Sequence, residues 1–183
     1  MKPIRRFVSL LLALAMALVP GLVAHAQPTE YQLKAVFLLN FARYVEWPAE
    51  SLRNTGRIEL CVLGRDPFGE ALEAIAGKQA QDREVSVRLL AMPQQAAECQ
   101  LLFLAGSEER RMHAALRELA SLPVLTVSDI DGFADAGGGI GFATVDDRVR
   151  FDINAAALQQ ASLKASAQLM RIARRVIGLE ARP

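Results

Sequence analysis

The sequence predicts an α/β domain of a three-layer Rossmann-like kind, with a mostly parallel sheet. Three observations lead to this fold class. Short apolar segments with the length of buried strands alternate with segments in which apolar residues recur every three or four positions. Two strand-like segments follow each other near the end of the chain and predict a β-hairpin. The residues after them predict an amphipathic C-terminal helix.

The first predicted helix follows Thr29, a typical N-cap residue, and Pro48 stops it. Its apolar residues recur at spacings of three and four, so we expect them to form the buried face: Leu33, Val36, Phe37, Phe41, Tyr44 and Val45. Trp47 lies at the end of this helix and has two interpretations. It either closes the core or lies on a surface that contacts a partner, because tryptophan is enriched at binding hot spots.

Strands and helices alternate in the middle of the chain. We expect strands at residues 58–63, 84–90, 101–104 and 124–127. Residues 64–67 form a turn, residues 68–75 a helix that ends before Gly77, and residues 107–119 a second helix that Ser107 opens. This order favours a largely parallel sheet with right-handed crossovers.

The end of the chain has a different pattern. Residues 139–144 and 148–153 predict a hairpin at a sheet edge, joined by Val145-Asp146-Asp147. From Asn154 the pattern is helical, with a point at Ser162 or Leu163 where the helix can bend. Its apolar stripe consists of Leu158, Ala161, Ala165, Leu169, Ile172 and Val176. Core packing explains this stripe, and so does a symmetric homodimer.

Three arginines fall near the C-terminus of that predicted helix, where cations meet the negative end of the helix dipole. They are Arg171, Arg174 and Arg175. Together with Trp47 they are our candidates for a surface that binds a partner.

The first 26 residues have the pattern of a signal peptide. Lys2, Arg5 and Arg6 precede an apolar run at residues 7–24, and Ala24-His25-Ala26 is a signal peptidase pattern. An uncleaved membrane anchor is the alternative, but Pro20 and Gly21 interrupt the run just before the cleavage pattern. We therefore expect residues 1–26 to be removed on export. Residues 27–183 then form a single domain that does not insert into the membrane.

The charge balance gives no indication of a nucleic-acid partner. The chain has 21 Lys and Arg residues and 20 Asp and Glu residues, and the first 26 residues contain three of the former and none of the latter. The exported part is therefore close to neutral, with a net charge of −2. Such a chain lacks the basic patch by which proteins bind nucleic acid.

Cys61 and Cys99 are the two cysteines of the chain, and in an exported protein they favour one disulfide. Two buried thiols or a metal pair are the alternatives. His113 is the only histidine of the exported part, so a zinc site built from cysteine and histidine has too few ligands. The motifs of common hydrolases and nucleotide-binding proteins are absent from the sequence. We therefore expect no catalytic residues, no metal and no cofactor.

Small and polar residues follow several predicted strands. In open α/β sheets, ligands bind in the crevice at the carboxyl ends of the strands. The residues that we expect to line such a crevice are Gly64, Asp66, Ser107, Ser128 and Asp129. The alternative is that these residues cap helices and form turns, as their types commonly do.

Several blocks of the sequence, in this order and spacing, are similar to the YfiR-like family of exported bacterial proteins. The blocks are YQLKAVFLLNF (31–41), VEWP (45–48), LCVLG (60–64), DPFG (66–69), CQLLFL (99–104), PVLTVSD (123–129), GFA (132–134), GG (137–138) with Ile140, and VRFDIN (149–154). The resemblance therefore covers essentially the whole exported part of the chain.

The resemblance implies an α/β sandwich-like domain in the periplasm that represses an inner-membrane diguanylate cyclase and responds to the redox state of the envelope. It also implies no catalytic residues, and the family's disulfide carries over to Cys61 and Cys99. Some relatives have a second cysteine pair near the terminal hairpin, which this chain lacks. One bond is therefore left for any redox sensing. A second hypothesis is a periplasmic small-molecule receptor that uses the predicted crevice.

Overall fold

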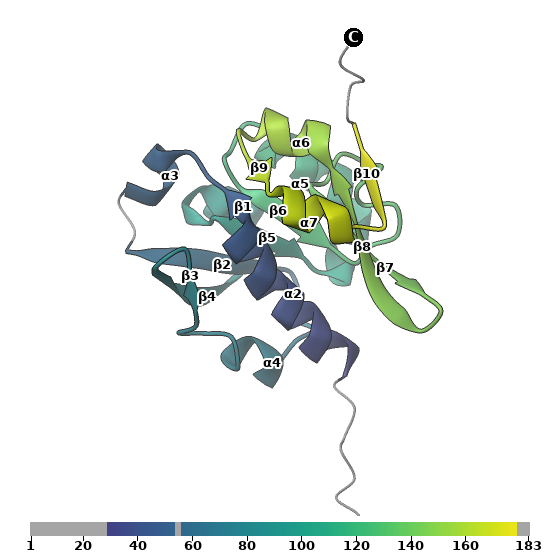
Figure 1. Cartoon of the computed structure of the whole chain (residues 1–183), viewed down its shortest axis with the longest axis horizontal. Coiled ribbons are helices and arrows are strands. Elements are labelled where there is room, and N and C mark those ends of the chain that lie inside the picture. The colour runs from purple at the N-terminus through teal and green to yellow at the C-terminus, as the bar shows by residue number, and fades with distance from the viewer. Residues whose placement is uncertain (1–28, 54–55, 179–183) are drawn as a thin grey trace, which may run out of the picture.

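The computed structural model describes residues 29–53 and 56–178, which form a mixed α/β fold around a curled sheet (Figure 1). The predicted signal peptide, residues 1–26, lies outside the described residues. Eight strands form the main sheet: β2 (Arg57–Leu63), β3 (Gln79–Ala80), β4 (Arg83–Leu90), β5 (Leu101–Leu104), β6 (Leu125–Ser128), β7 (Ile140–Val145), β8 (Arg148–Asn154) and β10 (Arg175–Ile177). The described residues include no helix long and apolar enough to cross a membrane.

The strand order in the main sheet is β10-β8-β7-β6-β5-β2-β4-β3. Strands β4, β2, β5, β6 and β7 run parallel, whereas β3 is antiparallel to β4 and β8 is antiparallel to β7. The α/β class and the mostly parallel sheet are therefore confirmed. The Rossmann-like three-layer arrangement stays a prediction.

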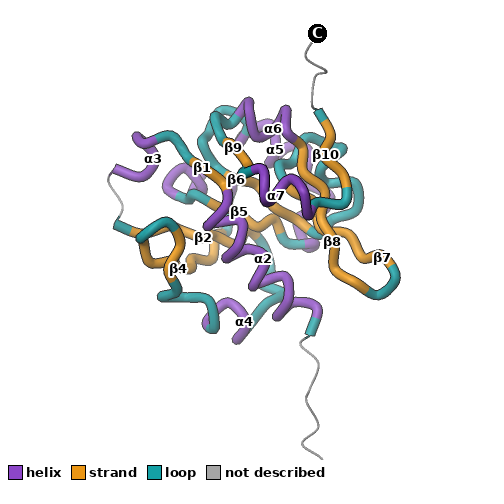
Figure 2. The backbone as a smooth tube through the Cα atoms, viewed as in Figure 1, coloured by secondary structure: helices purple, strands orange, loops and turns teal. Residues whose placement is uncertain are grey.

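The predicted hairpin is present as β7 and β8, with a tight turn at Asp146 and Asp147. Both turn residues have positive φ, of 49° and 55°, which is the backbone geometry of two-residue hairpin turns. The prediction that this hairpin forms the sheet edge is wrong. β10 pairs in parallel with β8, so the last strand of the chain covers that edge (Figure 2).

The first helix, α2 (Glu30–Tyr44), begins where the sequence predicts. Thr29 caps it in a reciprocal capping box with Gln32. The predicted buried face is partly wrong, because Leu33 and Val36 are 36% and 49% exposed. The face that packs on the sheet consists of Lys34, Ala35, Leu38, Leu39, Phe41 and Ala42.

Alternate residues of the central strands enter two hydrophobic clusters. Leu60 and Val62 of β2 belong to the cluster to which α2 contributes. In Figure 1, α2 crosses in front of the sheet. Cys61 and Leu63 belong to the other cluster. That second cluster also contains Ala96, from the 3-10 helix η1 (Pro93–Glu98), and residues of α5 (Met112–Leu119).

The remaining elements before the hairpin are short. α4 (Glu70–Glu73) occupies only the middle of the helix predicted at residues 68–75. The helix predicted from Ser107 begins as a 3-10 helix, η2 (Gly106–Arg111), and only then becomes α5. β1 (Val45–Glu46) and α3 (Ala49–Arg53) follow α2 on either side of Pro48.

The predicted amphipathic C-terminal helix is wrong as a single helix. The segment forms α6 (Ala155–Gln160), β9 (Lys164–Ala165), α7 (Ala167–Ile172) and β10. The break falls where the sequence allows a bend, at Ser162, whose φ of 59° is incompatible with a continuing helix. β9 then pairs antiparallel with β1, so the chain returns to the end of α2 before it crosses to β8.

Candidate functional site

The sheet has a topological switch point between β2 and β5. The chain leaves β2 toward β4 on one side and leaves β5 toward β6 on the other, although β2 and β5 are neighbours. In open α/β sheets, ligands bind outside the carboxyl ends of the strands at such a point. Gly64 directly follows β2, and Ser107 lies three residues after the end of β5.

Gly64 and Ser107, two of the residues that we expect to line a crevice, lie next to each other. Gly64 has a φ of +97°, and a Cβ atom there would lie 2.5 Å from Oγ of Ser107. The Ser107 hydroxyl accepts a hydrogen bond from the backbone N–H of Arg65 at 2.9 Å. An open cleft of about 580 Å³ lies beside this contact, lined by Gly64, Arg65, Leu89, Leu90, Ala91, Ser107, Glu108 and Arg111.

Asp66 and Ser128 make bonds within the chain, as turn formers do. The carboxylate of Asp66 accepts hydrogen bonds from the backbone N–H groups of Phe68 and Gly69, at 2.8 and 3.3 Å. Ser128 is fully buried, donates to the carbonyl of Leu104 at 2.7 Å and accepts from the N–H of Ile130 at 3.0 Å. Neither residue lines the cleft at Gly64.

Asp129 faces α2. Its carboxylate accepts hydrogen bonds from the Tyr31 hydroxyl at 2.9 Å and from Nζ of Lys34 at 2.6 Å. Burial is the largest cause that raises the pKa of Tyr31 to about 12, and the hydrogen bond to Asp129 is the second. Lys34 is 4% exposed and also pairs with Glu30 at 2.6 Å. The sequence signal for this network was a lysine within an apolar helix, four residues after a glutamate.

Trp47, one candidate for the partner surface, is a core residue. Its side chain is 7% exposed, and its indole N–H donates to the carbonyl of Gln100 at 2.9 Å. Trp47 therefore closes the core, which is the first of its two interpretations. Arg171 lies on α7 and is exposed.

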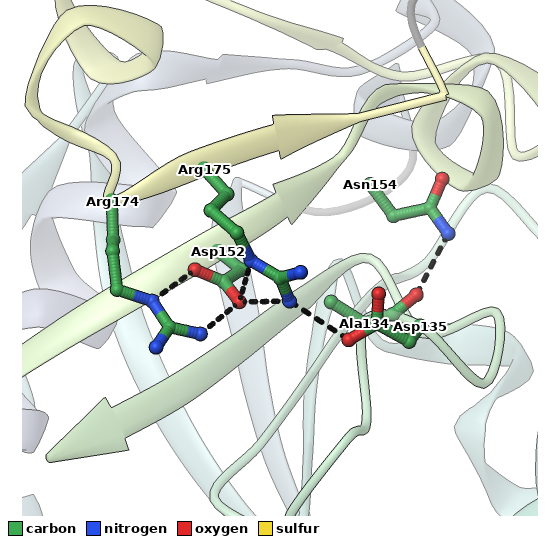
Figure 3. Close-up of polar contacts among 6 residues, drawn as sticks. All are labelled: Ala134, Asp135, Asp152, Asn154, Arg174 and Arg175. Atoms are coloured by element: carbon green, nitrogen blue, oxygen red, sulfur yellow. Dashed lines mark hydrogen bonds and ion pairs between the residues drawn. The ribbon is translucent and has the colours of Figure 1, made fainter.

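Arg174 and Arg175 directly follow Ala173, the C-cap of α7, and Arg175 begins β10. They converge on Asp152 of β8 (Figure 3). Arg174 binds this carboxylate through Nε, at 2.7 Å from Oδ1, and through Nη2. Arg175 contacts Oδ2 of the same carboxylate through Nε at 2.9 Å and Nη2 at 2.6 Å.

Asp152 is the buried anion of this group, which we call the Asp152 cluster: Asp152, Arg174, Arg175 and Asp135. The side chain of Asp152 is 5% exposed, and the hydrogen bonds from Arg174 lower its pKa despite burial. Nη2 of Arg175 also lies 2.8 Å from Asp135. A polar cavity of about 220 Å³ adjoins these side chains. The sequence signal was a charged residue inside an apolar strand, which requires a partner.

A disulfide joins Cys61 of β2 to Cys99, with a Cα–Cα distance of 6.0 Å. Cys99 is the C-cap residue of η1 and lies two residues before β5, so the bond ties η1 to the centre of the sheet. Both cysteines are buried, at 0% and 2% exposure. Arg88 of β4 lies beside the bond, with Nη2 at 3.7 Å from Sγ of Cys99.

Comparisons with known proteins agree with this fold. A family model described as YfiR/HmsC-like matches residues 31–174. The fold is also similar to a crystal structure of a conserved domain protein from Vibrio cholerae O1 biovar El Tor, with a TM-score of 0.54 and 8% sequence identity. That match covers 81% of this chain and 60% of the Vibrio chain, so at this identity it supports the fold alone.

Proposed function

This chain belongs to the YfiR/HmsC-like family, whose members are generally periplasmic regulators and not enzymes, and from this premise we propose that it is an inhibitory binding protein. Its target is the periplasmic region of an inner-membrane diguanylate cyclase. The observation that carries the proposal is the family match over residues 31–174. The signal peptide pattern at residues 1–26 supports export to the compartment where such a region is exposed.

Repression requires that the protein bind one state of the cyclase more tightly than the other. A regulator with equal affinity for the active and inactive states would leave their populations unchanged. We propose that the oxidised domain binds the inactive state preferentially, and that reduction of the Cys61–Cys99 bond weakens this binding. The exposed arginines Arg171, Arg174 and Arg175 are the candidate partner contacts that remain at the surface.

Deletion of the gene in its host tests this proposal. We expect cyclic di-GMP and surface attachment to rise, and the exported wild-type chain to restore both. A chain without residues 2–26 is the matched control and should fail to restore them, because it stays in the cytoplasm. Unchanged cyclic di-GMP in the deletion strain would rule out the cyclase as the target.

The cleft at Gly64 and Ser107 favours a second function, a periplasmic small-molecule receptor. It lies at the switch point of the sheet, and the exposed side chains of Arg65 and Arg111 border it. A thermal-shift screen with envelope metabolites tests this function, because a ligand that binds only the native state raises Tm. The Gly64→Ala variant is the matched control, because the added Cβ would collide with Ser107. A shift that persists in this variant would place the ligand elsewhere.

A further inference from the structure

Arg88 is adjacent to both cysteines of the disulfide. In the parallel register of β2 and β4, Arg88 is the direct neighbour of Cys61. Its guanidinium extends toward η1, where Nη2 lies 3.7 Å from Sγ of Cys99. In η1 the same guanidinium donates to the carbonyl of Gln95 at 3.2 Å and pairs with Glu98 at 2.8 Å. A fixed cation therefore faces one particular sulfur of the bond.

The elements packed around Cys99 are η1, β5 and α5, and Arg88 of β4 is the cation that contacts its sulfur. η1 contributes Glu98, an anion that is 75% exposed and therefore well solvated. β5 and α5 contribute apolar side chains to this cluster, among them Leu102 and Met112. The titratable residues of α5 lie on its exposed face: His113, Arg117 and Glu118.

The guanidinium also has an unused donor. Nε of Arg88 is buried and has no hydrogen-bond partner among the described residues. A neutral disulfide sulfur is at best a weak acceptor, whereas a thiolate is an anion that a guanidinium stabilises strongly. Neighbouring arginine and lysine side chains lower the pKa of a thiol well below its usual value of about 8.5.

We propose that Arg88 holds Cys99 as a thiolate once the disulfide is reduced, and that this makes the Cys61–Cys99 bond reducible instead of purely structural. In the reaction, a dithiol reductant forms its own disulfide and supplies two electrons, and the protein S–S bond breaks. One proton goes to the thiol of Cys61, and the other is released because Cys99 stays ionised. Stabilisation of the reduced form in this way makes a disulfide more oxidising.

An equilibrium titration of the purified, exported chain against dithiothreitol tests the proposal. When Cys99 is a thiol, dithiothreitol loses two protons and the protein takes up two. The equilibrium constant is then independent of pH. Above the pKa of Cys99 thiolate formation releases a proton, and the constant shifts tenfold toward the reduced protein for each pH unit. We expect this onset below pH 8 in the wild type. In Arg88→Gln we expect a higher onset, and therefore an equilibrium at pH 8 that is several-fold less favourable to reduction.

Two further variants control this measurement. Arg83→Gln removes an arginine from the same strand whose guanidinium contacts the carbonyls of Gln81 and Leu52 instead of the disulfide, and it should leave the titration unchanged. Glu98→Gln removes the anion that competes for Arg88, and it should shift the equilibrium several-fold toward reduction. Equal titrations for Arg88→Gln and the wild type would overturn the proposal.

The thiolate itself is measured in Cys61→Ser, where Cys99 is the only thiol. The pH dependence of its alkylation rate gives the pKa of Cys99. This pKa should rise by at least one unit when Arg88→Gln is added, with a several-fold loss of thiolate at neutral pH. If Cys61→Ser does not fold, the dithiothreitol titration decides alone. The role in regulation rests on the proposed function, whereas both measurements use no cyclase. A thiolate without any change of cyclic di-GMP in Arg88→Gln would therefore contradict the regulatory role and leave the chemistry standing.

Discussion

Two regions of this domain hold a peripheral segment to the sheet by different physical means. Near the centre of the sheet, a covalent bond joins η1 to β2, and the two cysteines are buried. At one edge, the Asp152 cluster holds β10 to β8 by ion pairs that two half-exposed arginines make with one buried carboxylate. Only a reductant can break the covalent tie, whereas ion pairs weaken in acid and at high salt. The two ties can therefore be tested separately.

The largest expected effect comes from removal of the covalent tie by Cys61→Ser with Cys99→Ser. The bond spans 38 residues, and a chain-entropy argument gives about 4 kcal/mol of unfolding free energy for a loop of this size. Urea unfolding of the oxidised wild type and of the double variant measures the difference. A loss below about 1 kcal/mol would show that the bond contributes little to stability.

Asp152→Asn should have the next largest effect, because it leaves two guanidinium groups without their carboxylate. Loss of one partner from a fully buried ion pair costs about 3 to 5 kcal/mol. Arg174 and Arg175 are 37% and 45% exposed and can turn to water, so we expect about 2 kcal/mol. Asp147→Asn at the exposed hairpin turn makes the same charge change and is the control. Equal unfolding curves for the two variants would mean that the cluster contributes no stability.

Acid should weaken the Asp152 cluster and leave the covalent tie intact. The folded protein lowers the pKa of Asp152 below the unfolded value of about 3.9. Its contribution to stability is therefore present above about pH 4 and is lost as the pH falls through the folded pKa. Urea unfolding at a series of pH values should show the gap between the wild type and Asp152→Asn closing below pH 4. The gap between the wild type and the cysteine double variant should stay constant over the same range.

The smallest expected effect belongs to the outer contact of the same cluster. Asp135 is 54% exposed where it meets Arg175, so Asp135→Asn should cost about 0.5 kcal/mol at low salt. About 1 M salt shortens the screening length to roughly 3 Å and should abolish this difference. An effect as large as that of Asp152→Asn would show that Asp135 is an equal member of the cluster.

Local patterns in the sequence predict the start of α2, the hairpin and most of the strands. Thr29 and Gln32 form the capping box from their own spacing, and the turn at Asp146 and Asp147 follows from residue types that tolerate positive φ. The cysteines, read with the export signal, predict the disulfide. Each of these features is decided within a few residues or by the compartment, so a single sequence contains it.

Long-range packing decides the features that the sequence leaves ambiguous. The helix α2 has apolar residues on most of its sides. Periodicity alone therefore does not choose between a face with Leu33 and Val36 and the buried face with Lys34. Asp129, almost a hundred residues away, makes burial of Lys34 possible. The periodicity of the segment after Asn154 likewise predicts one helix, because nothing local shows that β9 will pair with β1.

Local spacing and residue chemistry specify the α/β class, the α2 cap, the terminal hairpin and the export pattern, so the amino-acid sequence alone predicts them. Long-range packing specifies which face of α2 is buried, where the C-terminal segment breaks, and that β10 covers β8. It also decides that Arg88 meets Cys99 and that two arginines share Asp152. These contacts join residues that lie far apart in the chain or on different strands, and the register of the folded sheet brings them together.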